Sequence, residues 1–199
     1  MTSTEVRFVT RLLPWLLIAG GGIGLIAAFV LTVEKIALLR NSDYVPTCSI
    51  NPVLSCGSIM KTSQAEVFGF PNPLLGIAGF AAVVTIGVVL ATGAALPRWC
   101  WLGLQAGVTF GVVFVHWLIF QSLYVIGALC PYCMAVWAAM IPIFWYTTLH
   151  NLEQGHLPSP RRATAAMVGY HSVVLILWYL LIAGAVLQAF WFYWSTLIG

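Results

Sequence analysis

The stretch Cys130-Pro131-Tyr132-Cys133 stands directly before a long apolar run, and the rest of the chain is arranged around it. Proline is tolerated at the first position of a helix, because its missing N–H would have no intrahelical partner there. A helix that begins here places both cysteines on one face, where their sulfurs can form a disulfide. The positive end of the helix dipole also favours a thiolate. These features predict a reactive dithiol, although membrane cysteines also serve as small, inert core residues.

The composition is that of an integral membrane protein. Hydrophobic residues make up 61% of the 199 residues and charged residues only 7%, whereas a soluble domain carries roughly 25% charged residues. The eight basic and five acidic residues contain no long basic run, so no nucleic-acid partner is expected. Five cysteines allow two disulfides and leave one sulfur over.

Five apolar runs are long enough to cross about 30 Å of hydrocarbon as helices. The sequence therefore predicts an all-α protein with five transmembrane helices, forming one membrane domain over residues 1–199. The predicted spans are residues 12–33, 74–96, 99–126, 130–149 and 167–194. The first run is too long for a signal peptide and is interpreted as a permanent span. Its glycines at positions 20, 21, 22 and 24 predict close helix packing.

One long polar connection, residues 34–73, follows the first span and carries Cys48 and Cys56. A loop of this length is usually functional or disordered, and its segment Ser58–Phe68 is expected to form a short amphipathic helix. This connection and the one before the fourth span lie on the same side of the membrane. The two loop cysteines and the CxxC therefore face one compartment. Cys100 begins the third span at the opposite face, where an inert packing role is expected.

Lysines and arginines near the span ends predict the orientation. Those at positions 7, 11, 98, 161 and 162 lie on the side of the N-terminus, and those at 35, 40 and 61 lie on the side of the four cysteines. This bias predicts a multi-pass protein of the plasma membrane, surrounded by lipid, with its N-terminus in the cytoplasm. The C-terminus and the four cysteines are then extracytoplasmic, in a compartment that tolerates disulfides.

A loop with one cysteine pair facing a helix-end CxxC forms a relay for thiol–disulfide exchange, in which each step replaces one bond by another. The two electrons taken from an external thiol must then leave the protein. A lipid-soluble quinone is the natural acceptor, because it dissolves in the membrane where Cys133 is buried.

The pattern resembles the vitamin K epoxide reductase family, and its bacterial, actinobacterial-type members in particular. The resemblance covers roughly residues 12–190 and rests on three segments: Cys48-x7-Cys56, Phe68-Gly69-Phe70-Pro71-Asn72-Pro73-Leu74-Leu75-Gly76, and Cys130-Pro-Tyr-Cys133. It implies a four-helix bundle around a quinone, expected to be menaquinone, with one peripheral helix and a capping helix in the loop. Many bacterial members carry a fused thioredoxin-like domain. This chain ends at Gly199 without one, so a separate thioredoxin-like, DsbA-like protein is the expected partner.

The resemblance also implies the role of each relay cysteine. Cys48 receives electrons from the partner, and Cys56 passes them on through a transient disulfide with Cys130. Cys133 then faces the quinone ring. Members of the family carry a hydroxyl residue about six positions after the second loop cysteine. In this sequence that position is Thr62, and Ser63 lies beside it.

Further quinone-binding candidates are one amide and several aromatic residues. Asn72 sits where animal members place an asparagine that hydrogen-bonds the quinone carbonyl, and a donor there would stabilise the developing oxyanion. Turn chemistry in Pro-Asn-Pro explains this residue equally well. The aromatic candidates are Trp117, Phe120, Tyr124 and Trp137. Aromatic stripes are also common in cores and interfacial belts, so that alternative stays open.

Uncharged polar residues within the third and fifth spans are expected to bridge helices by hydrogen bonds; they are Gln105, His116, Gln121, His171 and Gln188. His116 has no second histidine at metal spacing, so it is interpreted as a packing residue and no metal site is expected.

The leading functional interpretation is a quinone-dependent thiol oxidase that drives disulfide formation in secreted proteins. The same relay would also serve a quinone or quinone-epoxide reductase. Two other classes remain: a membrane protein that handles Cu(I) through soft thiolates, and a structural subunit with static disulfides. Against metal transport, the spans hold no acidic relay and no ATP-binding motif is present.

Overall fold

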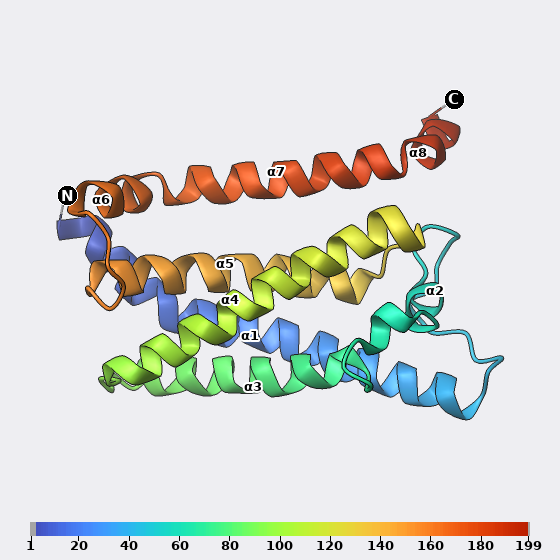
Figure 1. Ribbon diagram of the computed structural model, residues 1–199, viewed down its shortest axis with the longest axis horizontal. Coiled ribbons are helices and arrows are strands. Elements are labelled where there is room, and N and C mark those ends of the chain that lie inside the picture. Colours follow the sequence, from blue (N-terminus) through green and yellow to red (C-terminus); the bar gives the residue numbers. More distant parts are fainter. Residues whose placement is uncertain (1–2, 199) are drawn as a thin grey trace.

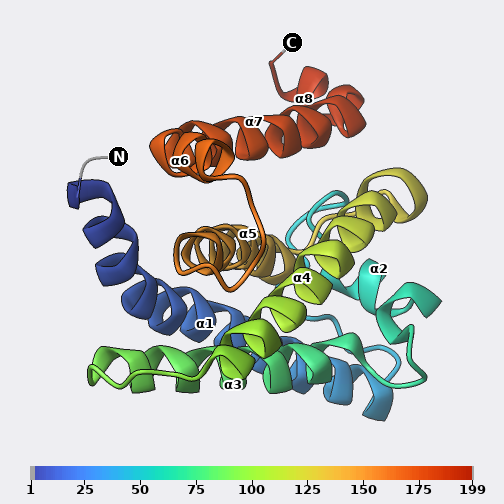
Figure 2. The same ribbon diagram turned by 60° about the vertical axis from the view of Figure 1, so that its left-hand side comes forward.

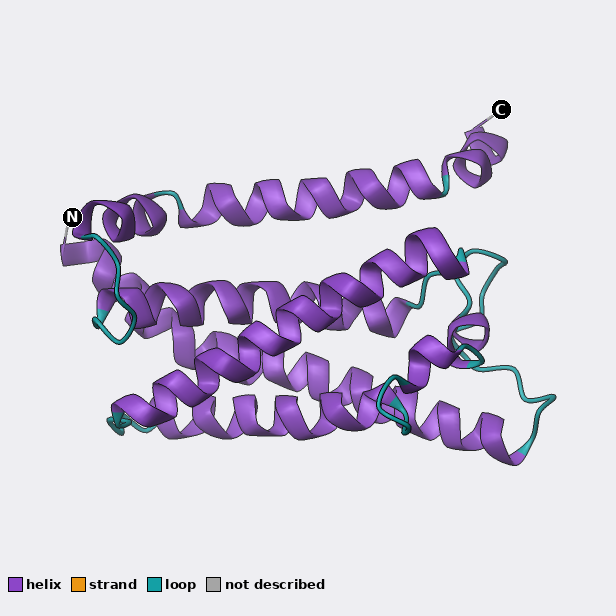
Figure 3. Ribbon diagram, viewed as in Figure 1, coloured by secondary structure: helices purple, strands orange, loops and turns teal. Residues whose placement is uncertain are grey.

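The computed structural model describes residues 3–198, and this part of the chain consists of helices joined by loops (Figure 1 and Figure 3). In chain order the elements are α1 (Ser3–Arg40), α2 (Cys56–Met60), the 3₁₀-helix η1 (Ser63–Glu66), α3 (Asn72–Ala91), α4 (Arg98–Phe120), the π-helix η2 (Gln121–Ile126), α5 (Pro131–Glu153), α6 (Arg161–Gly169), α7 (His171–Ala189) and α8 (Trp191–Ile198). Within the described residues, five helices are long and apolar enough to cross a membrane. The predicted all-helical membrane fold with five spans is confirmed.

Four of these helices, α1, α3, α4 and α5, form a bundle, and α7 lies along its side (Figure 1 and Figure 2). Helix α1 packs extensively on α3 and α5, and α4 packs on α5, whereas α3 and α4 touch at few points. Two glycines permit the close approach of α1 and α3. A Cβ on Gly24 would lie 2.5 Å from the ring of Phe80, and one on Gly87 would lie 2.9 Å from Leu17. The loose contact between α3 and α4 leaves room for the cavity described below.

The last predicted span is divided in the structure. Residues 167–194 fall on the end of α6, on α7 and on the start of α8, with breaks at Tyr170 and Phe190. Helix α7 has no fully buried residue, but several of its apolar side chains pack partly buried against the bundle core, and hydrogen bonds add to this attachment. Trp178 Nε1 donates to His116 Nε2 over 2.8 Å, and the Tyr146 hydroxyl lies 2.8 Å from His171 Nδ1. The predicted bridging role of both histidines is confirmed.

The redox loop, defined here as residues 41–71, lies at the end of the bundle opposite the N-terminus (Figure 1). Helix α1 continues past its predicted end at Val33 as far as Arg40, so Glu34 and Lys35 are helical residues. They are buried because their charged groups bond to the loop. The single helix predicted over Ser58–Phe68 is instead two short helices, α2 and η1, separated at Lys61 and Thr62.

Candidate active site

The N-terminus of α5 forms as the sequence predicts. Cys130 is the N-cap residue, with extended backbone angles (φ −116°, ψ 122°), and Pro131 is the first helical residue. The backbone N–H of Cys133 donates to Cys130 Sγ over 3.4 Å. The Cys130 sulfur therefore takes the position of a capping acceptor, where the helix dipole favours negative charge.

A short parallel bridge attaches the redox loop to this helix end. Leu54 and Leu129 pair in it. The Leu129 N–H donates to the Val53 carbonyl over 2.7 Å, and the Ser55 N–H donates to the Leu129 carbonyl over 2.9 Å. Cys56 directly follows Ser55, and Cys130 directly follows Leu129. The bridge therefore brings these two cysteines together.

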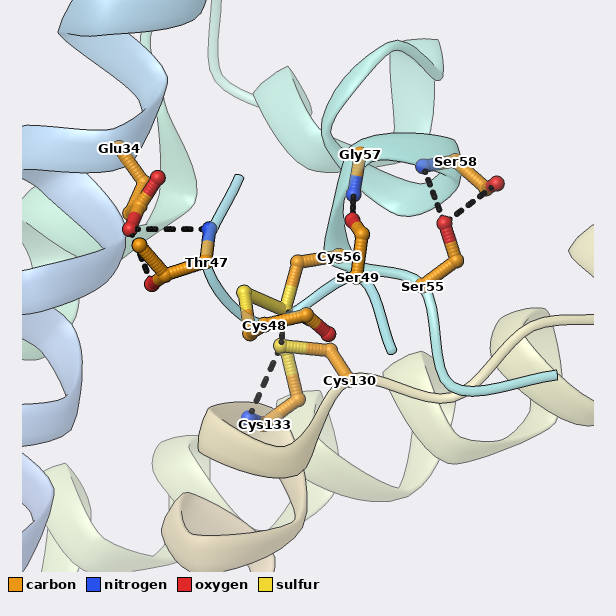
Figure 4. Close-up of a disulfide and its surroundings, with 10 residues drawn as sticks. All are labelled: Glu34, Thr47, Cys48, Ser49, Ser55, Cys56, Gly57, Ser58, Cys130 and Cys133. Atoms are coloured by element: carbon orange, nitrogen blue, oxygen red, sulfur yellow. Dashed lines mark hydrogen bonds between the residues drawn. A yellow bond between two sulfur atoms is a disulfide. The ribbon is translucent and has the colours of Figure 1, made fainter. Parts of the chain in front are cut away.

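The sulfurs of the loop and of the CxxC meet at this point (Figure 4). Cys48 and Cys56 form a disulfide, whereas Cys130 and Cys133 are free thiols. Cys56 Sγ lies 2.9 Å from Cys130 Sγ. Cys48, Cys56 and Cys130 are 5%, 0% and 1% exposed. A thiol is thus in contact with the disulfide that it would exchange with, and both are shielded from water.

The surroundings of Cys130 favour its thiolate. A hydrogen bond from the Cys133 thiol lowers the pKa of Cys130, and the backbone N–H groups of Cys133 and Tyr132 lower it further, while burial acts in the opposite direction. Because the thiolate is the nucleophile in exchange, a lowered pKa keeps more of Cys130 reactive near neutral pH.

Cys130 should therefore be alkylated at lower pH than an ordinary cysteine, whose pKa is about 8.5. The rate of iodoacetamide modification, followed by mass spectrometry in a variant with Cys48 and Cys56 replaced by alanine, should rise with a midpoint below that value. Adding Cys133→Ala should move the midpoint upward, because the thiol donor is lost. An unchanged midpoint would contradict the role assigned to that donor.

An apolar cavity of about 660 Å³ is bounded by the relay sulfurs and by α1, α3, α4 and α5. Its lining extends from Cys56, Cys130 and Cys133 to Trp99 and Cys100, which stand at the start of α4. Cys100, the one cysteine outside the two relay pairs, therefore lines the other end of the cavity. Among the described residues that line the cavity, one side chain is charged and one carries an amide. The space is suited to an apolar ring with a long hydrocarbon tail.

Two of the predicted quinone-binding residues, Asn72 and Trp137, line this cavity. Asn72 is the first residue of α3. Its Oδ1 accepts from the Val67 N–H over 3.1 Å, and its Nδ2 donates to the Gln64 carbonyl over 2.7 Å. These bonds fasten the loop to α3 and use one of the two N–H groups of the amide.

The predicted hydroxyl residues lie outside the cavity lining. Thr62 Oγ1 donates to the Ile59 carbonyl over 2.7 Å, which closes the turn after α2. Ser63 is exposed, and its Oγ donates to Gln64 Oε1 over 3.3 Å. A quinone-binding role for either residue stays a prediction.

The predicted aromatic stripe of the third span also lies outside the lining. Trp117 stacks on Phe114, and Phe120 contacts Tyr124. Phe110 and Phe114, earlier on the same helix, line the cavity instead. Helical spacing alone could have found them, but it does not show which turn of α4 lies level with the cavity. The binding roles predicted for the stripe stay predictions.

The sulfurs of Cys48, Cys56 and Cys130 all lie within 4.8 Å of one another, a spacing that could hold a metal ion. Two of them are joined as a disulfide, and metals bind the thiolate form of cysteine. A thiolate metal site would therefore require prior reduction of the loop.

A loop disulfide in contact with a free CxxC thiol, at the end of a membrane-spanning bundle, defines a membrane thiol–disulfide oxidoreductase. A family model described as the Vitamin K epoxide reductase family matches residues 15–148, and the chain belongs to this family. Its members in general use quinones and work with thioredoxin-like partners. The matched region ends before α6, α7 and α8. A comparison with curated proteins found no match to this chain.

Proposed function

We propose that the protein is a quinone-dependent thiol oxidase. It reoxidises a separate thioredoxin-like, DsbA-like protein and so drives disulfide formation in secreted proteins. The observation that carries this proposal is the 2.9 Å contact between the sulfurs of Cys56 and Cys130, beside an apolar cavity that Cys133 also lines. A disulfide with a purely structural role requires no free thiol beside it.

Electrons enter this relay at Cys48. A partner thiolate attacks the Cys48 sulfur, Cys56 leaves as a thiolate, and the second partner thiol displaces Cys48 to complete the partner's disulfide. Cys56 then attacks Cys130 in a Cys130–Cys133 disulfide, and Cys133 leaves. Attack of Cys48 on Cys56 restores the loop disulfide and frees Cys130. One disulfide and two thiols remain, which is the pairing found in the structure.

The final step oxidises the CxxC dithiol. The quinone is a substrate that accepts two electrons and two protons. Cys130 and Cys133 supply both as their thiols become a disulfide, so the step balances without another reactant. We assign Cys133 to the quinone-facing position, and Asn72 to donation toward a quinone carbonyl. Trp137 contributes apolar lining beside them.

The shape of the cavity supports a quinone with a long isoprenoid tail, such as menaquinone. Gly103, Gly107 and Gly111 line it on successive turns of α4. Apart from the neighbouring backbone of α4 itself, no described atom lies within 4 Å of a Cβ built on Gly103 or Gly107, so the helix leaves space along this side. An apolar tail lying there would extend away from the relay sulfurs.

We further propose that the relay cysteines are extracytoplasmic and the N-terminus is cytoplasmic. Lys35, one of three basic residues counted on the cysteine side, is buried and paired with Glu66. The support from charge is the bias of five basic residues on the side of the N-terminus against three on the side of the cysteines. A reducing cytosol would also reopen the disulfides that the relay presents to its partner.

A membrane-impermeant thiol reagent should label Cys48 or Cys56 on intact cells after gentle reduction, because both would face the exterior. Cys100 should stay unlabelled until the cells are lysed. Peptide mass spectrometry of the labelled protein reads out both positions. Labelling of Cys100 together with protection of the loop pair would show that the topology is the opposite of the one proposed. It would therefore contradict the secretory role.

The proposed function is tested by partner-driven quinone reduction. Purified protein receives a reduced DsbA-like protein and a menaquinone analogue, and the loss of quinone absorbance is compared with the loss of partner thiols. One disulfide should form for each quinone reduced. Faster reduction of a quinone epoxide than of the quinone would favour the reductase alternative. Stoichiometric binding of Cu(I) without any exchange with the partner would favour metal handling.

A further inference from the structure

Two consecutive charged residues, Glu34 and Lys35, are buried near the end of α1. They are 6% and 8% exposed, and neither takes part in the sulfur relay. Burying a charge is costly unless it is paired or hydrogen-bonded. Both residues are satisfied by groups of the redox loop rather than by another helix of the bundle, so their burial depends on where the loop lies.

Lys35 bonds to the part of the loop that follows Cys56. Its Nζ donates to the Met60 carbonyl over 2.6 Å and forms an ion pair with Glu66 Oε1 at 2.8 Å. Met60 is the last residue of α2, whose first residue is Cys56. Glu66 ends η1. One ammonium group therefore holds both short helices of the loop against α1.

Glu34 bonds to the part of the loop that precedes Cys48. Its Oε1 accepts from the Thr47 hydroxyl over 2.6 Å and from the Thr47 N–H over 3.4 Å (Figure 4). Thr47 is the residue directly before Cys48. The other carboxylate oxygen, Oε2, is buried, and the hydroxyl of Tyr44, another loop residue, also bonds to this carboxylate. The described partners of this carboxylate, Thr47 and Tyr44, thus both belong to the part of the loop that precedes Cys48.

We propose that Glu34 and Lys35 form a two-sided clamp that positions the loop disulfide for exchange. Adjacent residues on one rigid helix hold the two ends of the segment that contains Cys48 and Cys56. The clamp keeps the Cys56 sulfur against Cys130. This inference rests on one part of the proposed function, the exchange of electrons between Cys56 and Cys130. Its test uses neither quinone nor partner, so it can fail while the proposed function holds.

The equilibrium between Cys56 and Cys130 measures this positioning directly. In a full-length background with Cys48→Ala and Cys133→Ala, these two thiols react with oxidised glutathione to give one protein disulfide and two molecules of reduced glutathione. The equilibrium constant, read by mass spectrometry across glutathione ratios, is the effective concentration of one thiol at the other. A general loss of stability that leaves the folded loop in place does not change this quantity.

Lys35→Met and Glu34→Leu should each lower the effective concentration at least tenfold in that background. Lys35→Arg should lower it less than Lys35→Met, because it keeps the pair with Glu66. Lys61→Met is the matched control: this lysine lies on the same loop, is exposed, and has no side-chain bond among the described contacts. The control should stay within twofold of the background protein.

Glu66→Gln provides a second route if Lys35→Met does not fold. This substitution removes the negative charge of the Lys35–Glu66 ion pair at Glu66, the more exposed of the two partners. It should lower the effective concentration several-fold. Values within twofold of the background for Glu34→Leu and Glu66→Gln would overturn the clamp. A fall in Lys61→Met equal to that in the clamp variants would also overturn it, because the effect would then be a general loosening of the loop.

Discussion

Replacing Cys133 by alanine should lower quinone reduction at least about a thousandfold, a loss comparable to the removal of a nucleophile from other enzymes. Cys133 lies within the first turn of α5 and lines the cavity together with Cys130. Without it the dithiol cannot close into a disulfide, so no two-electron transfer to the quinone is possible. Quinone absorbance under partner-driven turnover measures the loss.

The same variant should still exchange disulfides with its partner. In addition, attack of Cys130 on the neighbouring loop disulfide has no resolving thiol in Cys133→Ala, so a Cys56–Cys130 disulfide should accumulate. Non-reducing peptide mapping identifies this species and shows that the variant is folded and reactive. Full quinone turnover by Cys133→Ala would falsify the assignment of the quinone-facing cysteine.

Replacing either loop cysteine by alanine should abolish oxidation of the protein partner, again by at least about three orders of magnitude. In the proposed relay the protein partner exchanges only with the loop pair, which lies between the partner and the buried Cys130. A small, penetrating thiol such as dithiothreitol can reach the CxxC directly. Quinone reduction driven by that donor should therefore partly survive in Cys48→Ala and Cys56→Ala.

The comparison of the two donors separates a shuttle from a structural clasp. A shuttle predicts loss with the protein donor and residual turnover with the small thiol. Equal loss with both donors, together with a lowered melting temperature of the variants, would show that the Cys48–Cys56 disulfide chiefly holds the fold together. Each variant is measured at the same quinone concentration, so that only the donor differs.

The membrane spans could be predicted from the sequence because an apolar run of sufficient length is a local property. Their ends were less predictable. The charges of Glu34 and Lys35 favoured a helix end at Val33, yet α1 continues to Arg40. The loop supplies partners for both charges, and no pattern within the helix itself indicates those partners.

The residues that line the cavity were likewise predictable only in part. Asn72 and Trp137 were predicted to bind the quinone and do line the cavity, whereas Phe120 and Tyr124 contact each other outside it. The helical period shows which residues of a helix share a face. It does not show how the helix is rotated or displaced against its neighbours, which depends on packing such as the loose contact between α3 and α4.

By itself, the sequence determined the membrane class, the start of α5 at the CxxC and the common side of the four cysteines, because apolar length and helix-start chemistry depend on residues close together in the chain. Only the tertiary structure decided which sulfurs meet. Cys56 and Cys130 are 74 positions apart, and the backbone bonds between Leu54 and Leu129 bring them together. The clamp residues on α1 likewise acquire their partners only when the loop folds back onto the helix. Contacts of this kind depend on how distant segments are arranged in space, which no local pattern of residues encodes.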